Sequence, residues 1–408
     1  MGVFNQLPLS KFYRIIGCRT KTTINLDFTW TKEQLDYKSR VIKFAQEELN
    51  NSIASNDVSS TFSMEDWQKC AHFGIQALAC PSAYGGQDKE IDILSATLAM
   101  EGLGYGCKDN GLPFALNAQM WTVQLPIAKF GTEMQKKRFL PKLASGKWIA
   151  SHGLTEPNAG SDIFSMETTA TKVDGGYVLN GKKCLITLAP IADVALVFAS
   201  TNKSLGKWGV TGFIVENGMP GFTRGENQHK MGLRTVPIGD LLFKECFVPL
   251  ENRLGGEGAG WSITTTSLEY DRCTILASQL GAMERQLEET IKFVKQRKQF
   301  GKSIGDFQSV SNRIANMKLR LETSRLMLYK VAWLKSIGKS AMMEAALLKL
   351  LLSESFVQSS LDAIRNQGGS GYLTATEVER DLRDAVGGVI YAGTSDIQRN
   401  IIANLLGL

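Results

Sequence analysis

Hydrophobic positions recur at helical spacing in the first and in the last part of this chain. From Thr31 to about Gly146, apolar residues lie three or four positions apart between turn clusters such as residues 81–86. Beyond Trp261 the same spacing returns, and it is clearest at Leu276, Leu280, Met283, Leu287, Ile291 and Val294. Residues three and four apart share one face of a helix, so both parts are predicted to be helical. Gly368-Gly369 is predicted to end a helix that begins near Ser340.

The middle of the chain has a different pattern. From about Ser151 to Leu254, short β-rich runs replace the helical spacing, for example at residues 194–198 and 210–215. Asp174-Gly175 is a hairpin turn signal between two such runs. The predicted fold class is therefore α+β, with an N-terminal helical domain (31–150), a central β domain (151–260) and a C-terminal helical bundle (261–408).

Length and composition agree with this organisation. The chain has 408 residues, which is more than one compact core normally holds, and its 43% hydrophobic and 21% charged residues are ordinary for globular proteins. The seven cysteines are scattered, without a Cys-x-x-Cys pair, which favours reduced thiols and a cytoplasmic protein. Three dispersed histidines predict no metal site, and no apolar run approaches the roughly 18 residues that span a bilayer.

The formal net charge is +6, but it is not concentrated as it is in nucleic-acid-binding proteins. There is no lysine and arginine run interleaved with aromatic residues, so we predict no nucleic-acid partner. A positive surface favours an acidic protein partner, although a solvated lysine excess explains the same charge.

Residues 1–30 are predicted to form an extension without fixed structure. Four basic residues and no acid precede Asp27, as in a targeting peptide, but there is no adequate apolar region and no secretory cleavage site. Gln6 stands where N-myristoylation requires serine or threonine.

The C-terminal segment from Tyr391 to Arg399 reads Tyr-Ala-Gly-Thr-Ser-Asp-Ile-Gln-Arg. It resembles the closing motif of the acyl-CoA dehydrogenase family, Tyr-Glu-Gly-Thr-Ser-x-Ile-Gln-Arg. In many members the second residue is the glutamate that removes the α-proton of an acyl thioester, whereas this chain has Ala392. Two alternatives follow: the base has been lost, or it lies elsewhere in the chain. Ala392 keeps its backbone N–H, which the resemblance implies binds the thioester oxygen of the substrate.

A second segment offers a replacement base. Asp271-Arg272 resembles the acid-arginine pair that some family members carry about one turn before a long helix. The resemblance implies that Asp271 is the catalytic base and that Arg272 lies near the pantetheine of the substrate. The residues alone favour a carboxylate that caps a helix start. Asp396 and Glu156 are the alternative carboxylates.

The family resemblance extends over almost the whole chain from Thr31 onward. It implies an acyl-CoA dehydrogenase-like fold, with an N-terminal helical domain, a central β-barrel-like domain and a C-terminal four-helix bundle. Residues 154–162, Leu-Thr-Glu-Pro-Asn-Ala-Gly-Ser-Asp, resemble the loop that cradles the flavin of FAD in this family. An ordinary loop closed by proline, asparagine and glycine is the alternative.

The resemblance also implies a set of binding residues. In the loop they are Leu154, Thr155, Gly160 and Ser161, of which Ser161 also contacts substrate. Leu185-Ile186-Thr187 stands where many members have Trp-Ile-Thr. Leu185 is interpreted either as a flavin contact or as a core strand position, and Thr187 as a partner of the flavin pyrimidine edge. The remaining cofactor contacts are Arg297, Phe300, Gln308, Arg365, Gly369, Thr394 and Asp396.

Arg297 and Gln308 of the family motif reach the FAD of a neighbouring subunit, so the resemblance implies a homodimer or homotetramer. Arg365 occupies a position that is glutamine in the family motif. An arginine fork suits a pyrophosphate.

Residues 281–288 and 317–321 look most like the branch that acts on acyl groups bound to carrier proteins, which includes prolyl-carrier-protein dehydrogenases. The implied function is FAD-dependent α,β-dehydrogenation of an acyl or aminoacyl thioester, carried by an acyl or peptidyl carrier protein in a natural-product pathway. The electron acceptor is an electron-transfer flavoprotein or oxygen. A short- or branched-chain acyl-CoA dehydrogenase is the first alternative. The second is a catalytically silent acyl-binding scaffold.

Overall fold

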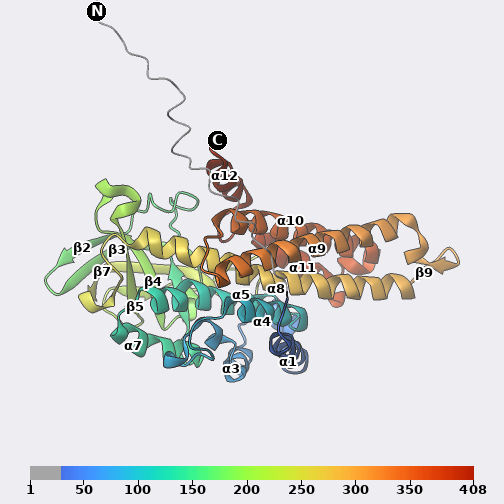
Figure 1. Ribbon diagram of the computed structural model, residues 1–408, viewed down its shortest axis with the longest axis horizontal. Helices are drawn as coiled ribbons and strands as arrows, with labels where there is room; N and C mark the ends of the chain where they lie inside the picture. The colour runs from blue at the N-terminus through green and yellow to red at the C-terminus, as the bar shows by residue number, and fades with distance from the viewer. Residues whose placement is uncertain (1–28) are drawn as a thin grey trace, which may run out of the picture.

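The structure is a computed structural model that describes residues 29–408. The predicted N-terminal extension therefore lies almost entirely outside the described residues. Figure 1 shows the β domain at one end of an elongated molecule, and the helices of the C-terminal region extending to the other end.

The N-terminal helices lie along one side of the long axis (Figure 1). A capping box starts the first of them, because the Thr31 side chain accepts from the Gln34 N–H and the Gln34 side chain accepts from the Thr31 N–H. The helices are α1 (Lys32–Glu48), α2 (Ile53–Ser59), α3 (Met64–Phe73), α4 (Ile93–Gly106), α5 (Gly111–Gln119), α6 (Leu125–Phe130) and α7 (Glu133–Ala144).

The β domain contains a mixed eight-stranded sheet in the order β6-β7-β3-β2-β4-β5-β8, with β1 paired to β4. Val173 pairs with Gly176 across the predicted Asp174-Gly175 turn, so the predicted hairpin is confirmed. The strands are β1 (Ala150–Gly153), β2 (Thr169–Val173), β3 (Gly176–Thr187), β4 (Val194–Ser200), β5 (Val210–Glu216), β6 (Phe222–Arg224), β7 (Ile238–Pro249) and β8 (Arg253–Leu254).

Long helices build the C-terminal region. They are α8 (Gly260–Gln296), α9 (Gln308–Ser336), α10 (Met342–Gln367), α11 (Val378–Gly388) and α12 (Ser395–Leu406), and the hairpin of β9 (Lys298–Gln299) and β10 (Lys302–Ser303) joins α8 to α9. Helix α8 packs against α4, α9 and α10, and α12 packs against α10. The helix predicted to end at Gly368-Gly369 is α10. Within residues 29–408 there is no helix whose length and hydropathy would let it cross a membrane.

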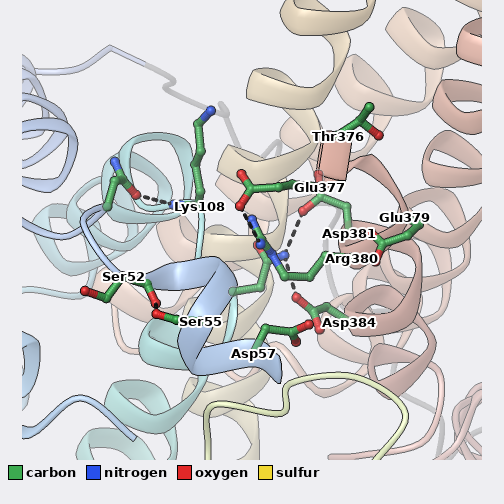
Figure 2. Close-up of polar contacts among 12 residues, drawn as sticks. Ser52, Ser55, Asp57, Lys108, Thr376, Glu377, Glu379, Arg380, Asp381 and Asp384 are labelled. Atoms are coloured by element: carbon green, nitrogen blue, oxygen red, sulfur yellow. Dashed lines mark hydrogen bonds and ion pairs between the residues drawn. The ribbon is translucent and has the colours of Figure 1, made fainter. Parts of the chain in front are cut away.

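A buried polar cluster ties α11 to the N-terminal helices. Figure 2 shows Asp57 of α2 beside Asp384 of α11, with Asp381 further along the same helix. The guanidinium of Arg383 binds both carboxylate oxygens of Asp57 at 2.7 and 3.1 Å, and the Asn110 amide donates to Asp381 at 2.9 Å and to Asp384 at 3.0 Å. These contacts fix the segment that leads into the 391–399 motif.

Candidate active site

Asp271 and Arg272 lie in the fourth turn of α8, and both are buried. The Arg272 Nε donates to the carbonyl oxygen of Ala392 at 3.2 Å. This bond joins α8 to the loop before α12, so two segments that are 120 residues apart meet here. The prediction that Asp271 precedes a long helix is wrong. Helix α8 begins at Gly260, because apolar Ile263 and the small residues Gly260, Thr264 and Ser267 give it a buried face upstream of Asp271.

The Asp271 carboxylate is in an unusual environment. It is 4% exposed, and its Oδ1 atom has no hydrogen-bond partner in the described part of the chain. Burial raises the pKa of Asp271 from 3.8 to about 7, against the opposing charge of Arg272. A helix-capping carboxylate would lie at a helix start and accept hydrogen bonds from backbone N–H groups. Asp271 lies inside α8, and no backbone N–H of the described residues donates to its carboxylate. A carboxyl group with a pKa near neutrality is suited to proton transfer.

The backbone at Ala392 is held in a left-handed conformation, with φ of 52°. The amide of Gln398 donates to the Ala392 carbonyl at 3.3 Å and to the Gly393 carbonyl at 3.0 Å. None of the hydrogen bonds among residues 29–408 uses the Ala392 N–H. That N–H is therefore free to donate to a substrate oxygen in a site adjoining Arg272.

A small cavity, mainly apolar but with several polar groups in its wall, lies deeper along α8. It is lined by Asn110, Phe114, Ser278, Gln279, Asp384 and Tyr391, among others. The Gln279 amide donates to the Tyr391 hydroxyl at 2.5 Å, while the Gln279 Oε1 atom has no partner among the described residues. Burial, followed by the charge of Asp271, raises the pKa of Tyr391. The cavity can therefore hydrogen-bond a polar group.

The loop of residues 154–162, the cradle loop, is anchored by a buried ion pair. The Lys183 Nζ lies 2.6 Å from Glu156 Oε1 and 3.2 Å from the Leu154 carbonyl oxygen. Although burial raises it, the pKa of Glu156 lies below its ordinary value because of Lys183 and the N–H groups of Glu167 and Thr168. Glu156 is thus engaged in holding the loop and is a poor proton acceptor.

Replacement of Lys183 by methionine is expected to lower the melting temperature and weaken cofactor binding. The change leaves Glu156 buried and unpaired, which typically costs about 3–5 kcal/mol. The matched control is Lys182→Met in the same strand, because the exposed pair of Lys182 with Asp240 contributes about 1 kcal/mol or less. Equal melting temperatures for the two variants would show that the buried pair does not stabilise the loop.

Next to the cradle loop, β3 contains a bulge that presents Leu185. The Cys184 N–H donates to the Thr155 carbonyl at 2.9 Å, and the register of β3 with β7 shifts between Lys183 and Ile186. Leu185 has φ of 56° and is 60% exposed. Its interpretation as a core strand position is therefore wrong. An exposed leucine on a strained backbone is a candidate contact for a ligand, in agreement with its interpretation as a flavin contact.

The other predicted residues of the flavin site lie in the cradle loop, in β3 and at the start of α12. Gly160 has no atom within 4 Å of the position of a Cβ, so a ligand can approach its backbone closely. Thr187 continues β3 opposite Ile238. Thr394 caps α12, with its hydroxyl accepting from the Ile397 N–H at 3.2 Å. The exposed carboxylate of Asp396 pairs with Arg399 at 3.3 Å, so it is not a second candidate for a buried base.

A second group of predicted cofactor residues lies elsewhere. The β9–β10 hairpin is at the end of the helical region far from the β domain (Figure 1). Phe300 in this hairpin is 93% exposed, and Arg365 at the end of α10 pairs only with Asp362 among the described residues. Arg313 of α9 donates to Asn366 of α10 at 3.2 Å, so the start of α9 lies beside the end of α10. Within one chain, the cradle loop is therefore far from the second group of predicted cofactor residues, Arg297, Phe300, Gln308, Arg365 and Gly369.

Comparison with known proteins identifies the family. Residues 31–147, 151–246 and 258–407 match the N-terminal, middle and C-terminal domains of acyl-CoA dehydrogenases, respectively. The chain belongs to the acyl-CoA dehydrogenase family. The predicted family and fold class are confirmed, and the protein is an FAD-dependent acyl-thioester dehydrogenase family enzyme.

Similar proteins include two kinds of acyl-CoA dehydrogenase family member. The chain is 41% identical over 384 residues to L-prolyl-(peptidyl-carrier protein) dehydrogenase of Pseudomonas fluorescens Pf-5, covering 94% of this chain and 100% of that protein. It is 38% identical over 383 residues to the short-chain-specific acyl-CoA dehydrogenase of Megasphaera elsdenii, covering 93% and 100%. The structure of the prolyl acyl carrier protein oxidase AnaB superposes with a TM-score of 0.91 at 48% identity, covering 93% and 100%.

The residues present fit FAD, the cofactor of this family. The exposed Leu185 and the open backbone at Gly160 suit a flat ring, and the arginines at the far end of the helical region suit a pyrophosphate. The sequence did not lead us to the anchoring role of Lys183 or to the cavity beside Tyr391. Adjacent Lys182 and Lys183 in a strand were a usable signal, because neighbouring strand residues point to opposite faces and one of them had to be inside.

Proposed function

We propose that the protein catalyses α,β-dehydrogenation of an acyl thioester, with Asp271 as the base. The observation that carries this proposal is the buried Asp271 carboxylate, whose Oδ1 atom has no partner in the described chain, beside the contact between Arg272 and Ala392. A relocated base explains how the family reaction survives alanine at position 392. It also argues against a catalytically silent scaffold, in which a buried unpaired carboxylate would only destabilise the fold.

In the proposed reaction, the Asp271 carboxylate removes the α-proton of the thioester. The thioester oxygen gains negative charge, which the N–H of Ala392 stabilises by hydrogen bonding. Arg272 holds the Ala392 carbonyl, and so sets the orientation of the neighbouring peptide. When bound, FAD supplies the acceptor for the hydride that leaves the β-carbon. Thr155, Ser161, Leu185 and Thr187 would hold its ring, with Thr394 and Asp396 at the start of α12.

The proposed substrate is an acyl or aminoacyl group on an acyl or peptidyl carrier protein. Similarity to the prolyl-carrier-protein enzymes supports this choice, as do the polar groups of the cavity beside Tyr391. An amino acid contains a nitrogen that these groups can bind, whereas a short alkyl chain does not. The similarity to the Megasphaera elsdenii enzyme supports short-chain acyl-CoA as the second candidate.

We further propose that two copies share each cofactor site. Within one chain, the cradle loop lies far from Arg297 and Gln308. This separation supports a homodimer or homotetramer in which a neighbouring subunit supplies Arg297 and Gln308 to each FAD. Either an electron-transfer flavoprotein or oxygen would reoxidise the flavin. Domains at 31–150, 151–260 and 261–408 remain our proposed division of the chain.

The substrate proposal predicts faster flavin reduction by an aminoacyl carrier-protein thioester than by the matching CoA thioester. The apparent affinity for the carrier form should fall with ionic strength, because salt screens attraction between a basic enzyme and an acidic carrier. Rapid-mixing assays with the same acyl group on both carriers, at two salt concentrations, measure this. Equal, salt-independent rates would favour the acyl-CoA alternative.

A further inference from the structure

Three aromatic rings form a row that runs outward from the cradle loop. Phe164, two residues beyond that loop, lies 4.9 Å from Trp261 between ring centroids. Trp261, at the start of α8, lies 6.4 Å from Trp208. Trp208 belongs to the segment η6 (Lys203–Gly209) between β4 and β5, and it is 57% exposed. The row therefore connects the cofactor loop to the surface.

Two lysines and an exposed leucine belong to the same short segment as Trp208, the outermost ring of this row. The Lys207 Nζ lies 4.2 Å from the ring centroid of Trp261 and 5.2 Å from that of Trp208. Lys203 is exposed, and Leu205 is 54% exposed. We call Lys203, Leu205, Lys207, Trp208 and Trp261 the aromatic-lysine patch. It offers two positive charges and the exposed apolar side chains of Leu205 and Trp208.

The patch rests on a tightly packed base. A Cβ at Gly209 would lie 1.8 Å from the Asn202 carbonyl oxygen, and one at Gly258 would lie 2.5 Å from the Trp208 carbonyl oxygen. The backbone of η6 is therefore pressed against the segment that leads into α8. Glu257 in that segment is bonded to the Tyr177 hydroxyl at 2.6 Å and lies 3.9 Å from Lys172, so it is turned to other partners than Lys203 and Lys207.

The distance from the aromatic-lysine patch to Asp271 can be spanned by a phosphopantetheine arm. Trp261 and Asp271 are ten residues apart on one helix, which corresponds to about 15 Å along its axis. Half-buried Thr265 and Leu268 continue from Trp261 toward Arg272 at helical spacing. This length is comparable with that of an extended phosphopantetheine arm.

We propose that the aromatic-lysine patch is the docking surface for an acidic carrier protein, which inserts its phosphopantetheine arm along α8 toward Asp271. This inference rests on the proposed carrier-protein substrate. Lys203 and Lys207 complement acidic side chains of the carrier, and Leu205 and Trp208 pack against apolar residues between those acids. A CoA thioester has the same arm but lacks the protein contacts, so the patch distinguishes the two substrates.

The test is the double charge reversal Lys203→Glu/Lys207→Glu. We expect kcat/KM for the carrier-protein thioester to fall roughly tenfold or more, mainly through KM, because like charges now face each other. Turnover of the same acyl group on free pantetheine should stay within twofold or so of wild type, since that substrate does not reach the patch. Lys32→Glu/Lys43→Glu on α1, at exposed positions, is the matched control with the same net charge change.

A second variant separates charge from apolar contact. Leu205→Ala keeps the net charge and should also raise KM for the carrier form alone. If the wild type prefers the carrier thioester but neither patch variant nor control changes KM, the docking surface lies elsewhere and the proposed function stands. If the wild type shows no preference for the carrier form, the proposed substrate is wrong, and the proposed docking role of the patch is wrong as well.

Discussion

Asp271→Asn is expected to bind FAD and fold normally but to lose reduction of the flavin by substrate. The amide has nearly the shape of the carboxylate but accepts no proton, and loss of a general base typically costs about 10²–10⁴-fold in rate. Stopped-flow absorbance of the flavin after mixing with thioester measures the step directly. Undiminished reduction in this variant would remove Asp271 from the reaction.

The same variant has an expected effect on stability that a helix-capping aspartate would not produce. Burial raises the pKa of Asp271 from 3.8 to about 7, so the folded protein holds a proton there that the unfolded chain releases above pH 4. Wild-type stability should therefore fall as the pH rises from about 4 to about 7, by at most about 4 kcal/mol from this group. The melting temperature of Asp271→Asn should equal that of the wild type at pH 4 and exceed it at pH 8.

A companion substitution tests whether position 392 still faces the same α-carbon. Adding Ala392→Glu to Asp271→Asn restores the family's usual carboxylate, and partial recovery of flavin reduction is expected. Alanine and glutamate both carry a Cβ, so the left-handed conformation observed at Ala392 adds little backbone strain for glutamate beyond that of alanine.

Mixed oligomers are expected to recover activity that neither parent variant has. Arg297→Ala/Gln308→Ala should bind FAD roughly 10- to 100-fold more weakly, because charge-assisted bonds to a phosphate contribute about 1.5–3 kcal/mol each. Asp271→Asn keeps those contacts but lacks the base. In a mixed dimer, one site combines an intact base with an intact Arg297 from the other copy.

Random pairing of the two variants should therefore give roughly a quarter of wild-type activity at an FAD concentration that saturates only the wild type. FAD binding by fluorescence provides a readout that is independent of turnover. The control is a mixture of separately purified homo-oligomers that do not exchange subunits, which should remain inactive. Activity of the co-expressed pair no higher than that of this control would mean that each chain binds FAD alone.

The sequence predicted the elements and their order well because helical spacing and the Asp-Gly turn are local signals. Thus the β2–β3 hairpin and the end of α10 at Gly368 lie where they were predicted. The return of helix beyond Trp261 was also predicted, but the motif resemblance placed Asp271 before the long helix, whereas α8 begins at Gly260. The stretch upstream of Asp271 contains threonines and serines that favour caps and turns, and only packing against the sheet makes them helical.

The site was partly predictable for a similar reason. Motif resemblance singled out Asp271, Arg272 and Ala392, but their meeting depends on a tertiary contact between α8 and the loop before α12. Leu185 could not be assigned, because a leucine in a strand is ordinarily buried and the bulge that exposes it depends on the pairing with β7. The pair Lys182-Lys183 indicates that one of the two lysines points inward, but only the fold shows that it is Lys183.

The central claim is that the base has moved from position 392 to Asp271. Its most direct test is the single-turnover rate of flavin reduction as a function of pH. Wild type is predicted to gain rate as the pH rises and to level off above about 7, the pKa of Asp271, while Asp384→Asn keeps that profile even though burial also raises the pKa of Asp384 to about 7. A wild-type rate independent of pH between 5 and 9, or the same profile in Asp271→Asn, would contradict the claim.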